Sequence, residues 1–324
     1  MSPEDELAGR LRRALYAHKA EGGDLDHEDE DAAVEAARRE LGATMSDFLD
    51  GAVNFNTVKY RLDGAFSTTS GAFPTREVVE ALSELVLSVD VDDLTPAMRS
   101  LGRAPEDLPE AKGRLLDAEE FVHREASKGT LKAAYLDRLM AVLLCLWHLQ
   151  APGEWPLRYP ALLDRLRREG LVGRTDPVDD TIDYAAAALR LAEATGADAA
   201  VLPRLLPLLD GELPPDAECV DGSRARAREA VGAGWWDGAL GWWGLVLAFD
   251  PLDREALEGR IAAYEGKGLH MMAVAEAEAL VELLPRDLAA HRLLLALYKG
   301  RGMIRDYNAE VRRFKALMLP GPDK

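Results

Sequence analysis

The residues that could act as nucleophiles, general bases or metal ligands are scattered along the sequence. Its six histidines are His18, His27, His123, His148, His270 and His291. None of them has the spacing of a metal site or a catalytic pair. The two cysteines, Cys145 and Cys219, are too few for a disulfide framework or a cysteine-rich zinc site. Asp179, Asp180 and Asp183 could present carboxylates on one helix face, but aspartates at a helix start usually cap the helix.

The sequence also lacks the short motifs of common active sites. It has no G-x-x-x-x-G-K-[ST] phosphate loop, no H-E-x-x-H pair, no C-x-x-C and no G-x-S-x-G elbow. Cys145 lies in an apolar run and is expected to be buried filler, and His148, beside Trp147, is expected to be a partly buried structural residue. We therefore expect a protein that is not an enzyme and has no cofactor and no metal. The alternative of an enzyme with its site in residues 1–210 stays open.

Composition restricts the partners. A formal net charge of −18 argues against broad contact with nucleic acid or an anionic membrane, because phosphate binding needs Lys and Arg. A local basic patch could still exist in such a chain. The first residues are not expected to form a signal peptide, and the longest apolar run, 140–149, is far short of the ~20 residues that cross a bilayer. We expect an acidic cytoplasmic protein, and its excess of Arg over Lys with abundant Ala is typical of a bacterium.

Apolar periodicity predicts an all-α fold with a mainly helical domain over residues 1–210. The helix over 131–149 is apolar nearly all round, so it is expected at the centre of this domain. Residues 53–69 are the exception: alternating apolar residues around Asp63-Gly64 predict a small β-hairpin. Two prolines in 211–216 then predict a linker over 211–220, followed by a separate domain over 221–324.

A repeat organises this second domain. Gly234 recurs as Gly268 and Gly302, each 34 residues later. The same offset relates four further pairs, which are Ala239 and Ala273, Pro251 and Pro285, Ala256 and Ala290, and Tyr264 and Tyr298. The glycine suits the turn between two helices, the alanine lets paired helices approach closely, and the proline is expected to begin the next helix. The third unit departs from the pattern, with Tyr307 where alanine is expected.

This period and punctuation resemble the tetratricopeptide repeat, a helix–turn–helix unit. The segment 234–285 is also similar to the helical activation domain of bacterial antibiotic-pathway regulators, which is itself such an array. The resemblance implies a short α-solenoid of about three units, with Trp236, Trp243 and Val246 among its core residues. It also implies a groove that holds another protein or a peptide. The implied groove residues are Asp221, Arg224, Arg228, Glu255, Glu258, Glu265, Arg292 and Lys299.

Trp235 and Trp242 are seven residues apart, hence on one helix face, and neither is a core position of the repeat. They predict a docking surface, either for the amino-terminal domain or for a partner, because Trp is enriched at interface hot spots. Together these features predict a protein–protein interaction adaptor or scaffold.

Two further readings accompany the adaptor hypothesis. A transcriptional or signalling regulator with an activation-like module is the alternative, although no basic recognition helix precedes the repeats. Residues 144–160 resemble a segment in the amino-terminal regions of McrB-type restriction ATPases, which implies an accessory component of a bacterial defence system.

Overall fold

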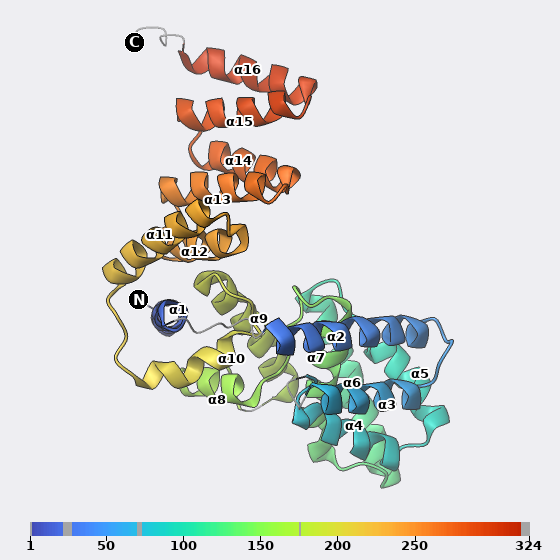
Figure 1. Ribbon diagram of the computed structural model, residues 1–324. Coiled ribbons are helices and arrows are strands. Elements are labelled where there is room, and N and C mark those ends of the chain that lie inside the picture. The colour runs from blue at the N-terminus through green and yellow to red at the C-terminus, as the bar shows by residue number, and fades with distance from the viewer. Residues whose placement is uncertain (1, 22–27, 70–72, 175, 319–324) are drawn as a thin grey trace, which may run out of the picture. The chain divides into compact units, whose positions relative to one another are not determined.

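The computed structural model describes residues 2–21, 28–69, 73–174 and 176–318. Within these ranges it contains sixteen α-helices, two short 3-10 helices and no strand (Figure 1). The all-α class predicted from the apolar periodicity is therefore confirmed. The contacts divide the chain into two compact units. Unit 1 is Met1–Leu11 with Glu21–Glu212, and unit 2 is Arg12–Ala20 with Leu213–Lys324.

Unit 1 is built from α1 to α10 and the two 3-10 helices, although only the first part of α1 belongs to it. The helices are α1 (Pro3–Ala20), α2 (Glu28–Leu49), α3 (Phe55–Thr68), α4 (Arg76–Ser88), α5 (Val91–Leu101), α6 (Leu108–Lys128), η1 (Ala133–Tyr135), α7 (Leu136–Gln150), α8 (Pro160–Arg168), α9 (Pro177–Thr195), α10 (Leu202–Leu205) and η2 (Leu206–Asp210).

Helix α7 lies at the centre of unit 1, as its apolar run predicts. Every residue from Leu139 to Leu149 is buried, and the helix contacts α2, α4, α6 and α9. Cys145 is fully buried, and this burial raises the pKa of its thiol to about 12. The thiolate is the reactive form of cysteine, so this residue acts as apolar filler.

The turn after α7 is tightly packed. Trp147 and Trp155 meet edge to face, with ring centroids 5.1 Å apart. The Nδ1 atom of the buried His148 lies 2.8 Å from the carbonyl oxygen of Trp155, and burial lowers the pKa of this histidine. His148 therefore has the structural place expected from the sequence.

The hairpin expected over residues 53–69 is wrong, because the segment forms α3. Asn54 caps this helix by accepting a hydrogen bond from the backbone N–H at its third position. Phe55, Val58 and Leu62 are buried, and their spacing of three and four residues matches one face of a helix. The alternating residues suggested a strand only because every second position of part of this stretch is also apolar.

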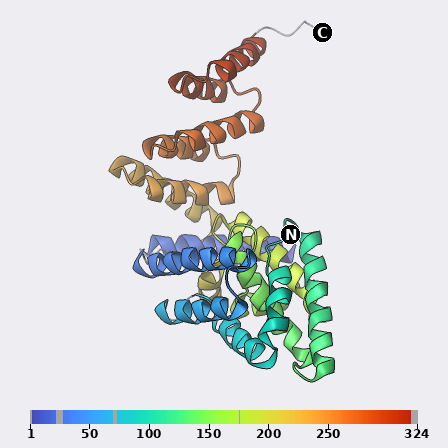
Figure 2. The ribbon, with the colours of Figure 1, turned by 90° about the vertical axis from the view of Figure 1, so that its right-hand side faces the viewer.

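Unit 2 consists of residues 12–20 of α1 and six further helices. These are α11 (Asp216–Ala233), α12 (Trp236–Phe249), α13 (Arg254–Gly266), α14 (His270–Leu283), α15 (Leu288–Gly300) and α16 (Ile304–Met318). Each packs against the next in the chain, and Figures 1 and 2 show them following one another as pairs. Since α11 begins at Asp216, the second half of the expected linker 211–220 is helical.

The 34-residue period is visible in the backbone. Gly234, Gly268 and Gly302 all have positive φ, at 72°, 79° and 68°, and each lies between the two helices of a pair. Only glycine adopts this left-handed conformation without strain. Ala239 and Ala273 are fully buried one turn into the second helix of their pairs.

The prolines have a different place from the one expected. Pro251 and Pro285 lie in turns ahead of α13 and α15 and do not begin these helices. The helix starts are capped by Asp253 and Asp287, also 34 residues apart, whose side chains accept hydrogen bonds from first-turn amides. An aspartate carboxylate at this position satisfies first-turn amides that have no partner within the helix.

Helix α12 packs against α13 through two tryptophans seated on two glycines. A β-carbon on Gly259 would lie 2.4 Å from the ring of Trp243, and one on Gly266 would lie 2.6 Å from the ring of Trp236. Trp243 is buried and Trp236 is half-buried. Both rings therefore occupy space that any larger residue at these glycines would take.

The last helix is attached to α15 by a buried polar pair. The Nδ1 atom of His291 hydrogen-bonds to the carboxylate of Glu310, and its Nε2 atom lies 3.1 Å from the carbonyl oxygen of Pro285. Both side chains are 3% exposed. Glu310 is the one buried residue of α16 in the described part of the chain, so this pair anchors the helix.

Candidate functional site

Ion pairs join the first helices of successive pairs in unit 2. Arg224 of α11 binds Asp253 at the start of α13, and Arg228 binds Glu255 through two hydrogen bonds of 2.6 and 2.7 Å. Arg254 in turn binds Asp287 at the start of α15. We call this set of pairs the charged row. It connects α11, α13 and α15 along one side of unit 2.

The carboxylates of the charged row are held in their ionised form. Burial alone would raise the pKa of Asp253, but Arg224 and the α13 amides lower it by more, so it lies below its ordinary value. Arg254 lowers the pKa of Asp287, and Arg228 lowers that of Glu255. Both members of each pair in the charged row are therefore ionised at neutral pH. These groups hold neighbouring helices together and do not exchange protons at that pH.

Most of the groove residues expected from the sequence belong to these contacts. Asp221, Arg224, Arg228 and Glu255 pair with one another or with Asp253. Glu258 binds Arg254, and Glu265 binds Arg301 and His270. Arg292 and Lys299 differ from the rest, because no carboxylate within the described ranges lies within 4.0 Å of either.

Between the charges of α13 and α15 lie two small exposed residues. Ala262 and Ala296 are 34 residues apart and occupy equivalent positions of these helices.

The two tryptophans expected to form a docking surface differ in exposure. Trp235 precedes α12 as its N-cap residue, is 61% exposed, and lies over Gly238. Trp242 lies within the helix and is buried: its ring meets Tyr16 of α1 at 6.4 Å between centroids and Lys19 at 5.2 Å. Trp242 is thus covered within unit 2, and Trp235 remains exposed.

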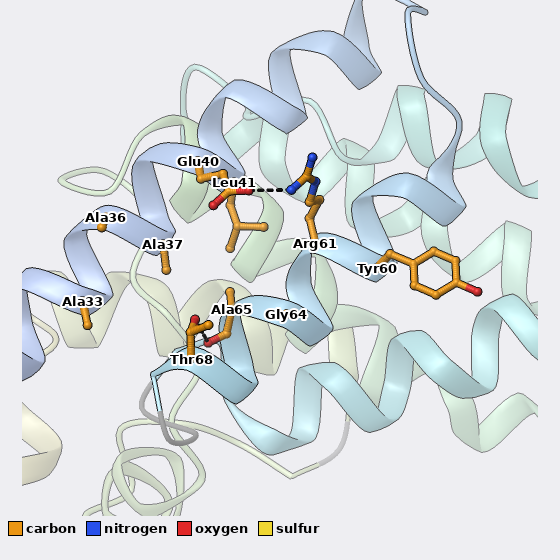
Figure 3. A pocket seen from close by; sticks show the side chains of 10 residues that line it. All are labelled: Ala33, Ala36, Ala37, Glu40, Leu41, Tyr60, Arg61, Gly64, Ala65 and Thr68. Carbon is orange, nitrogen blue, oxygen red and sulfur yellow. Dashed lines mark hydrogen bonds and ion pairs between the residues drawn. The ribbon is translucent and has the colours of Figure 1, made fainter.

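Unit 1 contains an open cavity of 490 Å³ between α2 and α3 (Figure 3). Its walls are mostly small side chains, and its polar groups include Glu40 and Arg61, which form an ion pair of 2.7 Å. The lining residues are Ala33, Ala36, Ala37, Glu40, Leu41, Tyr60, Arg61, Gly64, Ala65 and Thr68. A cavity with its two charges neutralised by each other has little to orient a polar substrate.

A second polar cluster in unit 1 surrounds Arg158, which is 5% exposed. Its guanidinium binds Asp137 at 2.7 Å and lies 3.7 Å from Glu77 of α4. Burial raises the pKa of Glu77 above its ordinary value of 4.5, although Arg158 acts in the opposite direction. Among the described carboxylates, Glu77 is the one whose pKa is raised, and its neighbours in this cluster are Arg158 and Asp137.

We predict that Glu77→Gln stabilises the protein at neutral pH. Because the folded-state pKa of Glu77 is above the unfolded value, its contribution is fully present below about pH 4 and is lost as the pH rises through the folded pKa. Glutamine, uncharged at every pH, removes this loss. Urea unfolding at pH 7 should therefore show a gain that shrinks towards zero at pH 4. The exposed Glu80→Gln on the same helix is the control, and a Glu77→Gln variant less stable at pH 7 would contradict the prediction.

Within the described ranges, no three His, Cys, Asp or Glu side chains come together as a metal site. The helices found there are also too short or too polar to cross a bilayer. Comparison with known proteins adds no assignment. No model of a protein family, no curated protein and no solved structure matches the chain.

Two features of unit 2 were not predicted from the sequence. Asp253 and Asp287 cap helices and receive arginines from the preceding unit, and their 34-residue spacing was the signal that could have found them. The contact of Tyr16 and Lys19 with Trp242 had no such signal, because nothing in α1 follows the repeat.

Proposed function

We propose that the protein is a non-enzymatic adaptor that binds another protein through unit 2, and that this unit is a tetratricopeptide-like array. The observation that carries the proposal is the structural equivalence of its helix pairs at a 34-residue interval. Positive-φ glycines, buried alanines and capping aspartates all recur at that offset. Repeats of this kind present a continuous surface along the first helices of their units.

The binding face in this proposal is the side of α11, α13 and α15 that carries the charged row. Its charges are mutually paired from α11 to α13, so they order the face without requiring a ligand. The exposed Ala262 and Ala296 give a bound segment close access to α13 and α15. A partner polypeptide would be held there by shape and by the unpaired charges of α15.

The test places bulk on this face without removing an ion pair. Ala262→Tyr with Ala296→Tyr is compared with Ala275→Tyr and Ala279→Tyr, two exposed alanines of α14. Both variants carry the same helix-propensity cost. Intact protein, used as bait in extract of its source organism, is expected to retain a specific protein that the α13–α15 variant loses by at least tenfold and the α14 variant keeps.

The experiment also decides against the proposal. Equal retention by the two variants would place the partner elsewhere, and retention of no protein by folded bait would remove the adaptor function. Circular dichroism and urea unfolding of each variant establish that the comparison is between folded proteins.

A further inference from the structure

The last two helices of unit 2 have the opposite charge from the rest of the chain. Residues 288–318 contain seven Lys or Arg residues and two carboxylates, a balance of +5 in a chain of net charge −18. The basic residues are Arg292, Lys299, Arg301, Arg305, Arg312, Arg313 and Lys315, and the acidic ones are Asp306 and Glu310. The remainder of the chain therefore carries a formal net charge of −23, since −18 minus +5 is −23.

Ion pairing changes at the same place. The five Arg residues of α11 and α13 and Lys267 in the turn after α13 lie within 4.0 Å of a carboxylate, whereas Arg286 in the turn after α14 has no such partner among the described residues. The paired arginines are Arg224, Arg226, Arg228, Arg254 and Arg260. On α15 and α16 only Arg301 and Arg313 have such a partner among the described residues. The others are exposed and unpaired, and we call them the basic patch: Arg292, Lys299, Arg305, Arg312 and Lys315.

The patch has two regular rows. Arg292 and Lys299 are seven residues apart on α15, as are Arg305 and Arg312 on α16, so each pair shares a helix face with a rise of ~10.5 Å. The guanidinium of Arg292 is also held in place, because it lies over the ring of Phe314 at 5.8 Å. Helix α16 buries only Glu310 among its described residues, which leaves the arginine-bearing side of this helix to solvent.

This geometry fits carboxylates on an extended polypeptide. In a polyproline-II segment, residues three apart lie on the same side and ~9 Å apart, close to the spacing within each row. Arginine binds carboxylates through paired hydrogen bonds, which favours a protein segment rich in Glu or Asp. A long nucleic acid fits less well, since it would extend beyond α15 and α16 and meet the acidic remainder of the chain.

We propose that the basic patch binds an acidic, extended segment of a partner protein. The inference rests on the proposed adaptor function and specifies the chemistry of its partner. It also gives the two ends of unit 2 different roles. The cations of α11 to α14 are paired with carboxylates of unit 2, and α15 with α16 offer cations that no carboxylate of the described residues pairs with.

The test uses the full chain and a fluorescein-labelled twelve-residue peptide with Glu at every third position and Pro or Ser between. A patch variant, Arg305→Gln, Arg312→Gln and Lys315→Gln, is matched by a control variant, Arg76→Gln, Arg226→Gln and Lys267→Gln. Both variants lose three positive charges from exposed positions. We expect fluorescence anisotropy to show at least a tenfold weaker affinity for the patch variant and less than a threefold change for the control variant.

Two comparisons identify the ligand class. The same peptide with Gln in place of Glu should bind at least tenfold more weakly to the intact protein. A twelve-base-pair DNA duplex should also bind more weakly than the Glu peptide, and tighter binding of the duplex would overturn the inference in favour of nucleic acid. Equal losses in the patch and control variants would overturn it as well, because only net charge would then matter.

Failure of this inference is distinguishable from failure of the proposed function. If the partner retained by intact bait is lost with Ala262→Tyr and Ala296→Tyr but kept by the patch variant, the adaptor function stands and the acidic-segment inference falls. If both the Ala262→Tyr, Ala296→Tyr variant and the patch variant lose the partner, the adaptor function and the acidic-segment inference both stand.

Discussion

Gly259→Ala is expected to destabilise unit 2 by ~2 kcal/mol or more. The added methyl group would lie 2.4 Å from the ring of Trp243, which is a buried side chain of α12. Overpacking of a buried site costs about 1–3 kcal/mol. Urea unfolding gives the loss in free energy, and hydrogen exchange of the α12 and α13 amides assigns it to this contact.

Gly244→Ala is the matched control for this substitution. Gly244 lies inside α12 with no other heavy atom within 4 Å of the position of its added β-carbon. Alanine there should stabilise the protein by about 0.5–1 kcal/mol, because glycine weakens a helix interior. The double variant Gly259→Ala with Trp243→Phe has a smaller ring at this contact and should recover part of the stability lost in Gly259→Ala. If Gly259→Ala and Gly244→Ala changed the free energy of unfolding equally, Gly259 and the Trp243 ring would not be in tight contact.

Glu310→Ala is expected to cost ~3 kcal/mol and to release α16. It removes the carboxylate from His291, whose ring is buried and has its second nitrogen on a carbonyl oxygen. Removing one member of a buried pair typically costs about 3–5 kcal/mol, because the other is left without a partner. Amide hydrogen exchange should show the largest loss of protection in residues 304–318.

Two further variants distinguish the contribution of the His291–Glu310 pair to stability from that of other residues of α16. Asp306→Asn removes an exposed charge from the first turn of α16 and should cost less than about 1 kcal/mol. Replacing both members, as His291→Leu with Glu310→Leu, should restore much of the stability, since an apolar pair needs no hydrogen-bond partner. Equal effects of Glu310→Ala and Asp306→Asn would show that the pair does not anchor the helix.

The parts of the fold that were predicted depend on local sequence. Apolar periodicity identified α7 as the central helix, and turn glycines located Gly234, Gly268 and Gly302 at their positive φ angles. Both signals act within a few residues, so one sequence is enough to read them. The hairpin over 53–69 failed for the same reason, because a short apolar stretch satisfies two periods and only the burial of Phe55, Val58 and Leu62 decides between them.

The candidate surface was harder to predict because its contacts join residues far apart in the chain. The groove positions followed from the repeat, but their pairing did not: Arg228 meets Glu255 and Arg254 meets Asp287 only after the helices stack. The basic patch was left open as a local exception to the acidic composition. Its unpaired state depends on where the carboxylates of other helices lie, which periodicity does not give.

The division of α1 has a consequence for how the molecule is made. Residues 12–20 belong to unit 2, yet nearly two hundred residues of unit 1 separate them from α11. On the ribosome, Tyr16 and Lys19 emerge early, while Trp242, which they cover, is synthesised much later. Unit 2 therefore closes only after unit 1 has been translated, and a shortened chain starting at residue 213 would expose the indole of Trp242 that α1 normally shields.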